Sequence, residues 1–579
     1  MITPKERALE QAARGLHEKA RKKVGASIEI FRRFRKIEEH RLRMWHKSGG
    51  NGREVSRQRA DLVDILFREL FDGIVRSIAP KGLPEPLVVT ALGGYGRREL
   101  APFSDIDLMF LTQKATPSPA IEEVIRQTLT ALWDIGYKVG HSTRSIPQAM
   151  KQANGDMITK TSMLESRFLT GERELFNAFK ERFEKDCVTG RDAEYVAWRL
   201  SNQAEMRGKY GNSVFMQEPN VKNGMGSLRD YHSLIWISYF KERINTTAKL
   251  VDKRLLRDSE RRALEKGYDF LLRVRTEMHY LTERPQDGLT LQLQGRVAGS
   301  FNYPQRHILR RVEAFMREYY SHSRDIHLIT ESVIERMKVI PEKSGLLGLI
   351  KPRTEKFDGF VARHGKIYEE SRETFAEDPY RLIRAFHHSQ VRQLDLSTEL
   401  SDLIRRRLRL VDRTFQYARA SRETFLAILS RKGEVGRILR EMHDLGFLGR
   451  YIPEFGALTC LVQHEFYHRY TTDEHTLVCI EKLDAIILSD EERFRGYRAL
   501  FQKLEDPAML YLALLLHDTG KAANQRHHED ASAILAQKVA RRLQLSSERR
   551  RMLILLVNSH YELSSTAQKR NLDDPATIA

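Results

Sequence analysis

The sequence predicts a predominantly helical α+β protein built from several domains. Its 579 residues correspond to roughly three to five domains of about 100–200 residues each. Most of the chain carries apolar residues at helical spacing, whereas residues 76–170 alternate strand-like and helix-like segments. The composition, 41% hydrophobic and 30% charged, supplies enough apolar side chains for folded cores and excludes a disordered chain.

Cysteine content and hydropathy exclude several classes of protein. The three cysteines, Cys187, Cys460 and Cys479, show no CxxC spacing, so neither a disulfide framework nor a zinc ribbon is expected. The N-terminal segment has no apolar signal-peptide core, and no run of about eighteen apolar residues occurs in the sequence. We therefore expect a cytoplasmic protein that has no membrane partner.

The formal charge of +19, from 97 Lys+Arg against 78 Asp+Glu, raises the question of nucleic-acid binding. The basic residues of 21–47 and 403–410 are interspersed with acidic or apolar residues at helical intervals, as on solvated helix faces. No basic segment rich in aromatic residues resembles an RNA-recognition motif. The sequence therefore favours basic helix surfaces over nucleic acid as a partner.

Residues 1–75 are predicted to be helical. Apolar residues recur at i, i+3 and i+4 spacing between Leu62 and Leu70, and Pro80 marks the end of this pattern. A loop is expected at residues 48–54, where glycine and polar residues cluster.

Residues 76–170 are predicted to form an α/β or α+β domain. Short apolar and β-branched runs at 87–92 and 106–111 indicate two buried strands joined across a glycine turn. An amphipathic helix is expected at 121–136 and a further strand at 137–145.

The rest of the chain is predicted to be mainly helical. Residues 171–340 form one helical region, and residues 341–440 form a linker or second helical region. Within the latter, residues 341–365 carry the glycines and prolines of a loop or a small β insert. A last helical domain is expected over residues 441–579.

Glycines followed by paired aspartates form the first candidate site. Asp105 and Asp107 are two positions apart on a predicted strand, so both carboxylates point to one face, where their repulsion favours a bound Mg²⁺. Gly93 and Gly94 let backbone N–H groups approach a triphosphate, and Ser104 could add a hydroxyl donor. This combination predicts metal-assisted nucleotidyl transfer, in which Mg²⁺ lowers the charge on the α-phosphate.

The alternative without a catalytic role is a turn that carries acidic residues on the surface, because a DxD motif alone is common. Glycines after one strand and DxD on the next form a much narrower pattern, and this pattern favours the nucleotidyltransferase interpretation. Such sites normally need a third carboxylate, for which Asp156 and Glu165 are the nearest candidates. Glu165 could equally be a helix-surface acid.

A second candidate site is built from histidines and carboxylates. His517 and Asp518 interrupt the leucine-rich helix of residues 510–522. Burying an imidazole and a carboxylate there costs desolvation free energy unless the two groups bind something. With His475 from another helix they could hold a divalent metal whose bound water attacks a phosphoester, while Lys521 could stabilise the phosphate charge.

Three further residues, His527, His560 and Asp574, are candidate ligands of the same metal. For single histidines, a surface or core position is the commoner explanation. His464 and His468, which lie close to His475 without a clear role, illustrate that alternative.

Several segments together resemble the bifunctional uridylyltransferase/uridylyl-removing enzymes of the PII nitrogen-signalling protein, from about residue 60 to the last residue. They are GGYGRRELAPFSDIDLMFL (93–111), EPNVKNGMGSLRDYHSLIW (218–236), LGRYIPEFG (448–456), HRYTTDEHTL (468–477), LALLLHDTGK (512–521) and LDDPATIA (572–579). Both catalytic motifs occur in wider superfamilies. The EPNVKNGMGSLRD segment and the surroundings of DEHTL are more specific, and they set the family.

The resemblance implies a DNA polymerase β-like nucleotidyltransferase domain at 76–170, an associated helical domain at 171–340 and an all-α HD phosphohydrolase domain at 441–579. The first domain would transfer UMP from UTP to a tyrosine of PII, with Gly93, Gly94, Asp105 and Asp107 holding the nucleotide and Mg²⁺. The HD domain would hydrolyse the uridylyl-tyrosine bond with a divalent metal at the family positions His475, His517, Asp518, His527 and His560.

The sequence departs from the family pattern in three ways. Ser559 precedes His560 where the family has His-His, and Asn571 replaces an Asp, which leaves Asp574 as the nearer carboxylate. These changes leave the transferase motif intact and put the hydrolase in doubt. The family's two C-terminal ACT domains, which sense glutamine, have no counterpart before Ala579, so this is either a piece of a longer protein or a member without its sensor.

Two other functions compete with this reading. A tRNA CCA-adding-type nucleotidyltransferase with an HD domain would use the positive charge for RNA, but the EPNVKNGMGSLRD segment has no place in that class. A non-enzymatic PII-binding regulator with a decayed HD site is motivated by Ser559 and Asn571, and only for the second domain.

Overall fold

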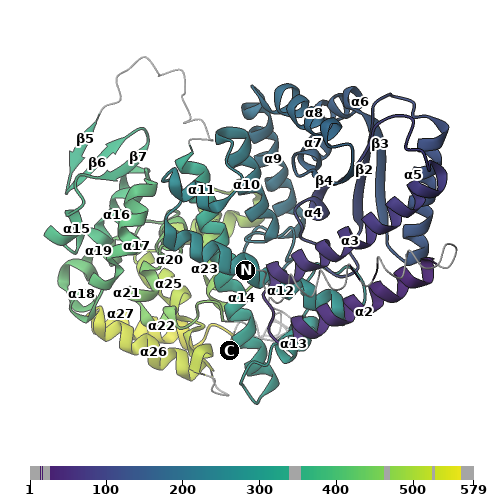
Figure 1. Cartoon of the computed structure of the whole chain (residues 1–579). Coiled ribbons are helices and arrows are strands. Elements are labelled where there is room, and N and C mark those ends of the chain that lie inside the picture. The colour runs from purple at the N-terminus through teal and green to yellow at the C-terminus, as the bar shows by residue number, and fades with distance from the viewer. Residues whose placement is uncertain are drawn as a thin grey trace. The chain divides into compact units, whose positions relative to one another are not determined.

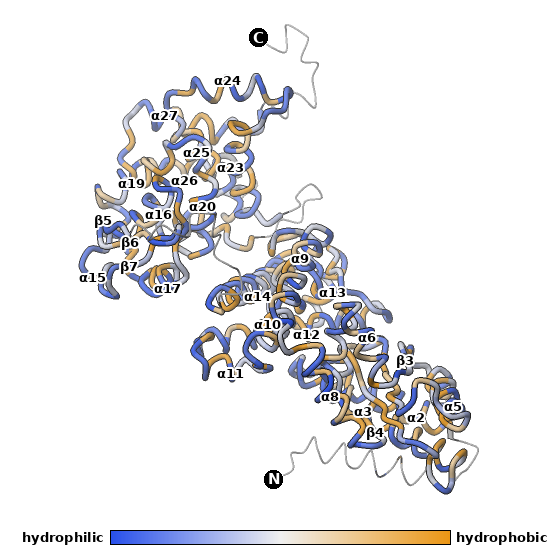
Figure 2. Tube along the Cα trace, turned by 90° about the horizontal axis from the view of Figure 1, so that it is seen from above, coloured by the Kyte–Doolittle hydropathy of each residue, from blue (hydrophilic) through white to orange (hydrophobic). Residues whose placement is uncertain are grey.

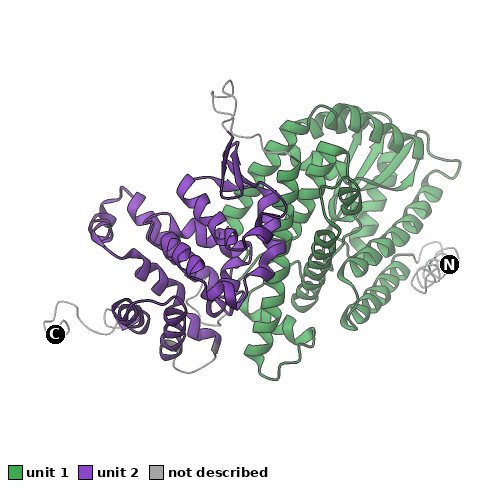
Figure 3. Ribbon diagram, turned by 90° about the vertical axis from the view of Figure 1, so that its left-hand side faces the viewer, with its two compact units in different colours: residues 1–214, 218–339 green, residues 215–217, 340–579 purple. Residues whose placement is uncertain are grey.

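The protein, represented by a computed structural model, is described at residues 27–337, 354–461, 470–523 and 528–562, and at positions 14 and 16. It divides into two compact units: unit 1 comprises residues 1–214 and 218–339, and unit 2 comprises residues 215–217 and 340–579 (Figure 3). Helices predominate in both units, and each contains one small four-stranded sheet among its described residues (Figure 1). The predicted fold class, α+β and predominantly helical, is confirmed.

Unit 1 consists of a mixed sheet with helices on both of its faces and a helical remainder. Its strands are β1 (Leu87–Ala91), β2 (Ile106–Thr112), β3 (Val139–Ser145) and β4 (Arg167–Gly171). Its helices are α2 (Ser27–Lys47), α3 (Gly52–Ile78), α4 (Gly93–Gly96), α5 (Pro119–Ile135), α6 (Ile146–Gly155), α7 (Met157–Leu164), α8 (Arg173–Phe183), α9 (Asp192–Tyr210), α10 (Leu228–Glu242), α11 (Thr247–Asp252), α12 (Asp258–Thr282), α13 (Leu291–Ser300) and α14 (Ile308–Arg336).

The loop predicted at residues 48–54 is shorter in the structure. Helix α2 ends at Lys47 and α3 already begins at Gly52, because the side chain of Asn51 accepts a hydrogen bond from the backbone N–H of Glu54 and caps the new helix. Most of residues 1–26 lie outside the described part of the chain.

The sheet of unit 1 has the strand order β3-β2-β1-β4. Strand β1 is antiparallel to β2 and β4, whereas β2 and β3 are parallel, with Asp107 opposite Gly140. Three of the strands match the predicted ones. Strand β4 was not predicted: in its sequence, RFLTG, only Leu169 is fully buried, and its pairing with β1 is irregular between Val89 and Thr90.

The two faces of this sheet pack against different helices. On one face, alternate residues of β1 and β2 such as Val89 and Leu108 join a core formed with α2, α3 and α5. On the other, Val88 and Met109 pack with residues of α6 and α8 and with Trp236 of α10. Side chains alternate along a strand, so Asp107 shares the face of Met109 and points toward the side occupied by α10.

Unit 2 combines a small sheet with a large helical core. Its strands are β5 (Glu355–Phe357), β6 (Phe360–Arg363), β7 (Lys366–Glu369) and β8 (Asp395–Leu396). Its helices are α15 (Thr374–Glu377), α16 (Arg381–Arg392), α17 (Thr398–Arg407), α18 (Arg413–Tyr417), α19 (Arg419–Leu429), α20 (Val435–Asp444), α21 (Phe447–Tyr451), α22 (Pro453–Gly456), α23 (Thr472–Leu488), α24 (Arg495–Lys503), α25 (Pro507–Leu516), α26 (His528–Arg542) and α27 (Ser547–Asn558).

One hydrophobic core spans unit 2 from Phe360 in β6 to Val557 in α27, so it is continuous across residue 441, where a domain boundary is predicted. Helix α25, PAMLYLALLL, is apolar on almost every side and lies inside this core, as expected of such a helix. Most other helices carry both hydrophobic and hydrophilic residues (Figure 2). No described helix is long and apolar enough to cross a membrane. The β insert predicted at 341–365 includes β5 and β6, and its first part lies outside the described residues.

Candidate functional site

The glycine turn of unit 1 lies against the Asp107 carboxylate. After β1 the chain turns through the single-turn helix α4, and the backbone N–H of Leu92 donates to the carbonyl oxygen of Asp107 at 2.9 Å. Gly93 has a φ of +53°, and a β-carbon there would lie 3.5 Å from Asp107 Oδ2. On the neighbouring strand, a β-carbon at Gly140 would lie 2.4 Å from Asp107 Oδ1. Glycine at these positions leaves room around the carboxylate.

Asp105 and Asp107 are both exposed, and Ile106 between them is buried. Partial desolvation and the negative charge of Asp105 raise the pKa of Asp107 above its ordinary value. Two carboxylates that repel each other next to a glycine turn form a donor set suited to a hard divalent cation such as Mg²⁺. Ser104 immediately precedes them, and its backbone N–H donates to the carbonyl oxygen of Ala101 at 3.3 Å.

The two candidates for a third carboxylate are both engaged in bonds within the protein. Asp156 caps α7 by accepting hydrogen bonds from the backbone N–H groups of Ile158 and Thr159. Glu165 accepts hydrogen bonds from Arg97 Nη1 and from Trp236 Nε1, each at 2.6 Å. A metal-binding role for either residue stays a prediction.

A buried polar network, not found by sequence reasoning, joins α4 to α10. The Arg97 guanidinium donates to Glu99 at 2.7 Å as well as to Glu165. His232 Nε2 lies 3.0 Å from Glu99 Oε2 and 2.7 Å from the Tyr268 hydroxyl. Burial and the charge of Arg97 lower the pKa of His232 to about 3, so its imidazole is neutral at physiological pH. The network fixes the glycine turn against the helical part of unit 1.

Gly96 provides a stability test of this close packing. A β-carbon at Gly96 would lie 2.2 Å from the backbone carbonyl oxygen of Glu165, which cannot move without shifting α7. We expect Gly96→Ala to lower the free energy of unfolding by about 1–3 kcal/mol, as other overpacking substitutions do. Gly155→Ala is the control, because no atom lies within 4 Å of that β-carbon position. Chemical denaturation of both variants measures the effect, and equal stabilities would contradict the packing described.

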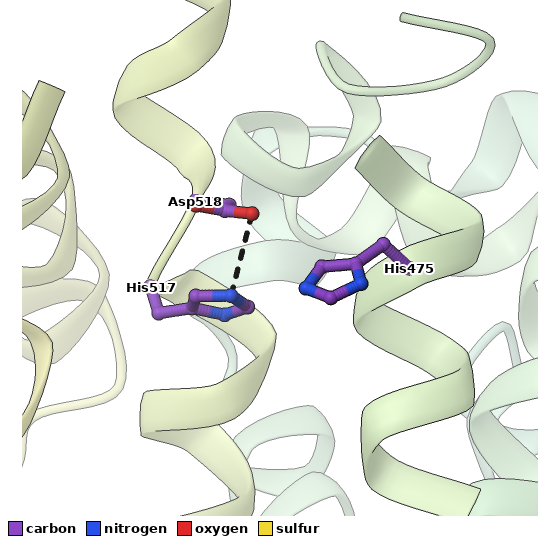
Figure 4. A group of neighbouring side chains, drawn as sticks. All are labelled: His475, His517 and Asp518. Atoms are coloured by element: carbon purple, nitrogen blue, oxygen red, sulfur yellow. Dashed lines mark ion pairs between the residues drawn. The ribbon is translucent and has the colours of Figure 1, made fainter. Parts of the chain in front are cut away.

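In unit 2 the structure brings together His475, His517 and Asp518. His475 lies on α23, and the other two residues directly follow α25 (Figure 4). One ligand atom from each residue lies within 4.8 Å of the others. His517 Nε2 is 3.3 Å from Asp518 Oδ2, and Asp518 is only 2% exposed. Two imidazoles and a buried carboxylate form a donor set suited to a divalent metal ion.

The residues before His475 anchor its helix. Asp473, fully buried, accepts a hydrogen bond from the backbone N–H of Cys460 at 3.1 Å and lies 3.3 Å from His443 Nε2. Glu474 pairs with Arg440 at 2.6 Å. These two acids of the DEHTL motif therefore fix the start of α23, and with it the position of His475.

Bonds to neighbouring groups hold His517 and Asp518 in place. His517 Nδ1 lies 2.7 Å from the carbonyl oxygen of Leu514 and donates to it, which turns Nε2 toward Asp518. Lys521 Nζ lies 3.0 Å from Asp518 Oδ2. Although burial opposes ionisation of Asp518, His517 and Lys521 hold the pKa of this carboxyl well below its usual range. The carboxylate is therefore charged and able to bind a cation.

Of the other predicted ligands, His560 is brought close to this group. Its ring centre lies 5.1 Å from that of His517, and its Nδ1 lies 2.7 Å from the carbonyl oxygen of Val557. Cys479, which sequence reasoning did not connect with the site, has its Sγ 3.7 Å from His475 Nε2. The predicted ligands His527 and Asp574 lie outside the described residues, as do His464, His468 and Asn571.

The fold and the two sites define a protein that combines a nucleotidyltransferase domain with an HD domain. Family models agree: residues 194–334 match the GlnD PII-uridylyltransferase model, residues 360–451 the uridylyltransferase GlnD third domain and residues 472–579 the HD domain. The chain belongs to the GlnD uridylyltransferase family.

Curated relatives support the same family. The chain is 33% identical over 534 residues to a protein of Novosphingobium aromaticivorans. This match covers 91% of this chain and 58% of the relative. It is 34% identical over 547 residues to a protein of Azospirillum brasilense, in a match that covers 93% of this chain and 58% of the relative. It is also 34% identical over 561 residues to a protein of Caulobacter vibrioides, in a match that covers 94% of this chain and 59% of the relative. Each is named a bifunctional uridylyltransferase/uridylyl-removing enzyme. The chain thus spans less than two thirds of the length of these relatives.

Proposed function

We propose that unit 1 transfers UMP from UTP to a tyrosine of the PII signal protein, and that the HD domain hydrolyses the resulting uridylyl-tyrosine bond. Both activities would take place in the cytoplasm, where a nucleotide and a signal protein are available. The observation that carries the first activity is the Gly93 turn next to the paired carboxylates Asp105 and Asp107. The observation that carries the second is the cluster of His475, His517 and Asp518.

In the transfer reaction, Asp105 and Asp107 would hold Mg²⁺, and the backbone of Gly93 and Gly94 would accommodate the triphosphate, with Ser104 as an additional donor. The chemistry that Mg²⁺ would supply there is partial neutralisation of the α-phosphate. The tyrosine oxygen forms a bond to the α-phosphorus, the bond to the β-phosphate oxygen breaks, and pyrophosphate leaves with the bonding electrons. The tyrosine proton passes to solvent. The residues of this chain bind and orient the reactants, which is the main contribution an enzyme makes to phosphoryl-type transfer.

In the hydrolysis reaction, His475, His517 and Asp518 would hold a divalent metal ion. The chemistry that such an ion would supply is activation of water for attack on the phosphoester. Lys521 keeps the Asp518 carboxylate ionised. The same ammonium would also stabilise phosphate charge. His560 lies beside His517 and is the candidate for an additional ligand or a proton donor to the departing tyrosine.

Radiolabelled UTP tests the transfer. The purified chain, with Mg²⁺, [α-³²P]UTP and a PII protein, is expected to label PII, and a PII variant whose modified tyrosine is replaced by Phe is expected to stay unlabelled. In a parallel reaction, a tRNA lacking its 3′ CCA end is supplied with CTP and ATP as the competing acceptor. Extension of the RNA without labelling of PII would reject the proposal.

A further inference from the structure

The segment 218–230 contains the EPNVKNGMGSLRD motif and forms a fixed loop that continues into the first turn of α10. Asn220 Oδ1 accepts hydrogen bonds from the backbone N–H groups of Lys222, at 3.1 Å, and Asn223, at 2.8 Å. Gly226 has a φ of +69°, and its N–H donates to Asp230 Oδ2 at 2.8 Å. These bonds hold the loop in one conformation, and the side chains it presents are therefore pre-positioned.

The loop presents two cations side by side. The backbone N–H of Arg229 donates to the carbonyl oxygen of Lys222 at 2.9 Å. The Arg229 guanidinium lies over the Trp236 ring at 5.5 Å, and its Nε lies 3.4 Å from Asn223 Oδ1. Among the residues that the structure describes, no carboxylate forms an ion pair with Arg229. A half-buried guanidinium held by an aromatic ring and an amide is poised to bind an anion.

The carboxylates near these two cations are bonded to other groups. Glu165 is held by Arg97 and Trp236. Asp287 accepts a hydrogen bond from Arg275 Nε at 2.7 Å, whereas Lys222 Nζ is 3.9 Å away. Burial and the charge of Arg97 lower the pKa of Arg229 to about 10, and burial and Arg275 lower that of Lys222. A bound anion would relieve the cost of gathering these charges.

The two cations lie on the side of the sheet where the nucleotide is proposed to bind. Asp107 shares the face of the sheet with Met109, which packs in one core with Trp236, and the Arg229 guanidinium lies over that same ring. Arg229 contacts Trp236, which is joined through Glu165 to Arg97, and Arg97 Nη2 is 3.7 Å from the β-carbon position of Gly94. The loop therefore faces the glycine turn and the paired carboxylates.

We propose that Lys222 and Arg229 bind the β- and γ-phosphates of the nucleotide and so hold the pyrophosphate leaving group. This inference rests on the proposed transfer function. It assigns a role to the motif that distinguishes the chain from other nucleotidyltransferases: the fixed loop supplies a point charge from Lys222 and a forked donor from Arg229. Asp105 and Asp107 would hold Mg²⁺ for the same nucleotide, and Lys222 and Arg229 would add positive charge to its β- and γ-phosphates.

The comparison of UTP with UMP provides the decisive readout, because UMP has no β- or γ-phosphate. We would measure displacement of a fluorescent UTP analogue by UTP and by UMP in the presence of Mg²⁺, for the wild type, Lys222→Ala and Arg229→Gln. Each variant is expected to weaken UTP binding about tenfold or more, as for loss of a charged hydrogen bond, and to change UMP binding far less. Steady-state kinetics should show the same loss as a raised KM for UTP. Arg229→Lys, which keeps the charge and loses the fork, should be intermediate.

Lys241→Ala and Arg262→Gln are matched controls. Both residues are exposed on helices of unit 1, where they pair with Asp192 and Asp258, and their removal should leave UTP binding unchanged. Circular dichroism melting confirms that each variant folds. If the folded variants keep the wild-type ratio of UTP to UMP affinity, the role of the loop is disproved while transfer to PII still stands. If the wild type neither binds UTP nor labels PII, the proposed function itself fails.

Discussion

Replacing Asp107 by Asn is expected to reduce UMP transfer to PII by on the order of 10³-fold, while unit 1 stays folded. Asn preserves the shape of the side chain and removes the charge that would bind Mg²⁺. The side chain is exposed at the start of β2, and the register of the sheet depends on backbone bonds and on buried neighbours such as Ile106. The substitution also removes repulsion from Asp105, so the free energy of unfolding should not fall.

The test of Asp107→Asn requires a control variant with the same change of charge, and both UMP transfer and UMP release should be measured. Asp105→Asn should cause a similar loss, whereas Asp134→Asn, at an exposed position of α5, should leave transfer unchanged. Release of UMP from previously modified PII should persist in all three variants, because it depends on the HD domain. Transfer above a tenth of the wild-type rate in Asp107→Asn would remove this residue from the nucleotide site.

The parts of the site that could be predicted are those encoded by neighbouring residues. The glycine turn and the DxD pair lie within one hairpin-like segment, and strand periodicity predicts both carboxylates on one face. In the structure β2 begins at Ile106, directly after Asp105, and Asp107 is exposed within it. The bonds of Arg97 could not be predicted in this way. Its partner Glu165 is 68 positions away, and Glu165 in turn bonds to Trp236, 71 positions further on. Such contacts depend on how helices pack on the sheet, which periodicity does not specify.

The same distinction applies to unit 2. The local surroundings of His517 and Asp518 could be recognised as a metal-site motif, but their distance from His475 depends on the packing of α23 and α25 in one core. That core includes helices on both sides of residue 441, whose apolar faces meet in the same interior. The domain boundary at residue 441 stays a prediction. Strand β4 was missed because its few apolar residues give no clear alternation.

Replacing His517 by Asn is expected to abolish release of UMP from modified PII and to leave UMP transfer unchanged. His517 offers Nε2 to the cluster because its Nδ1 is bonded to the carbonyl oxygen of Leu514, and no other described side chain takes its place between His475 and Asp518. Loss of a ligand should weaken metal binding by at least about 100-fold, more than loss of an outer-shell partner. Elemental analysis of the dialysed protein and a UMP-release assay measure the two effects.

His364→Asn is the matched control for this test. His364 is exposed in a turn between β6 and β7 with a φ of +51°, a conformation that Asn adopts readily, so the change should affect neither metal content nor UMP release. Chelator treatment of the wild type, followed by stepwise return of Mg²⁺, Mn²⁺ or Zn²⁺, identifies the ion that restores hydrolysis. If the wild type holds no metal and releases no UMP, the HD site is inactive, and Ser559, beside His560, is the first position at which to restore a ligand by Ser559→His. If His517→Asn retains both metal and release, hydrolysis takes place elsewhere, and the buried pair of Asp518 and Lys521 is then a structural ion pair of the core.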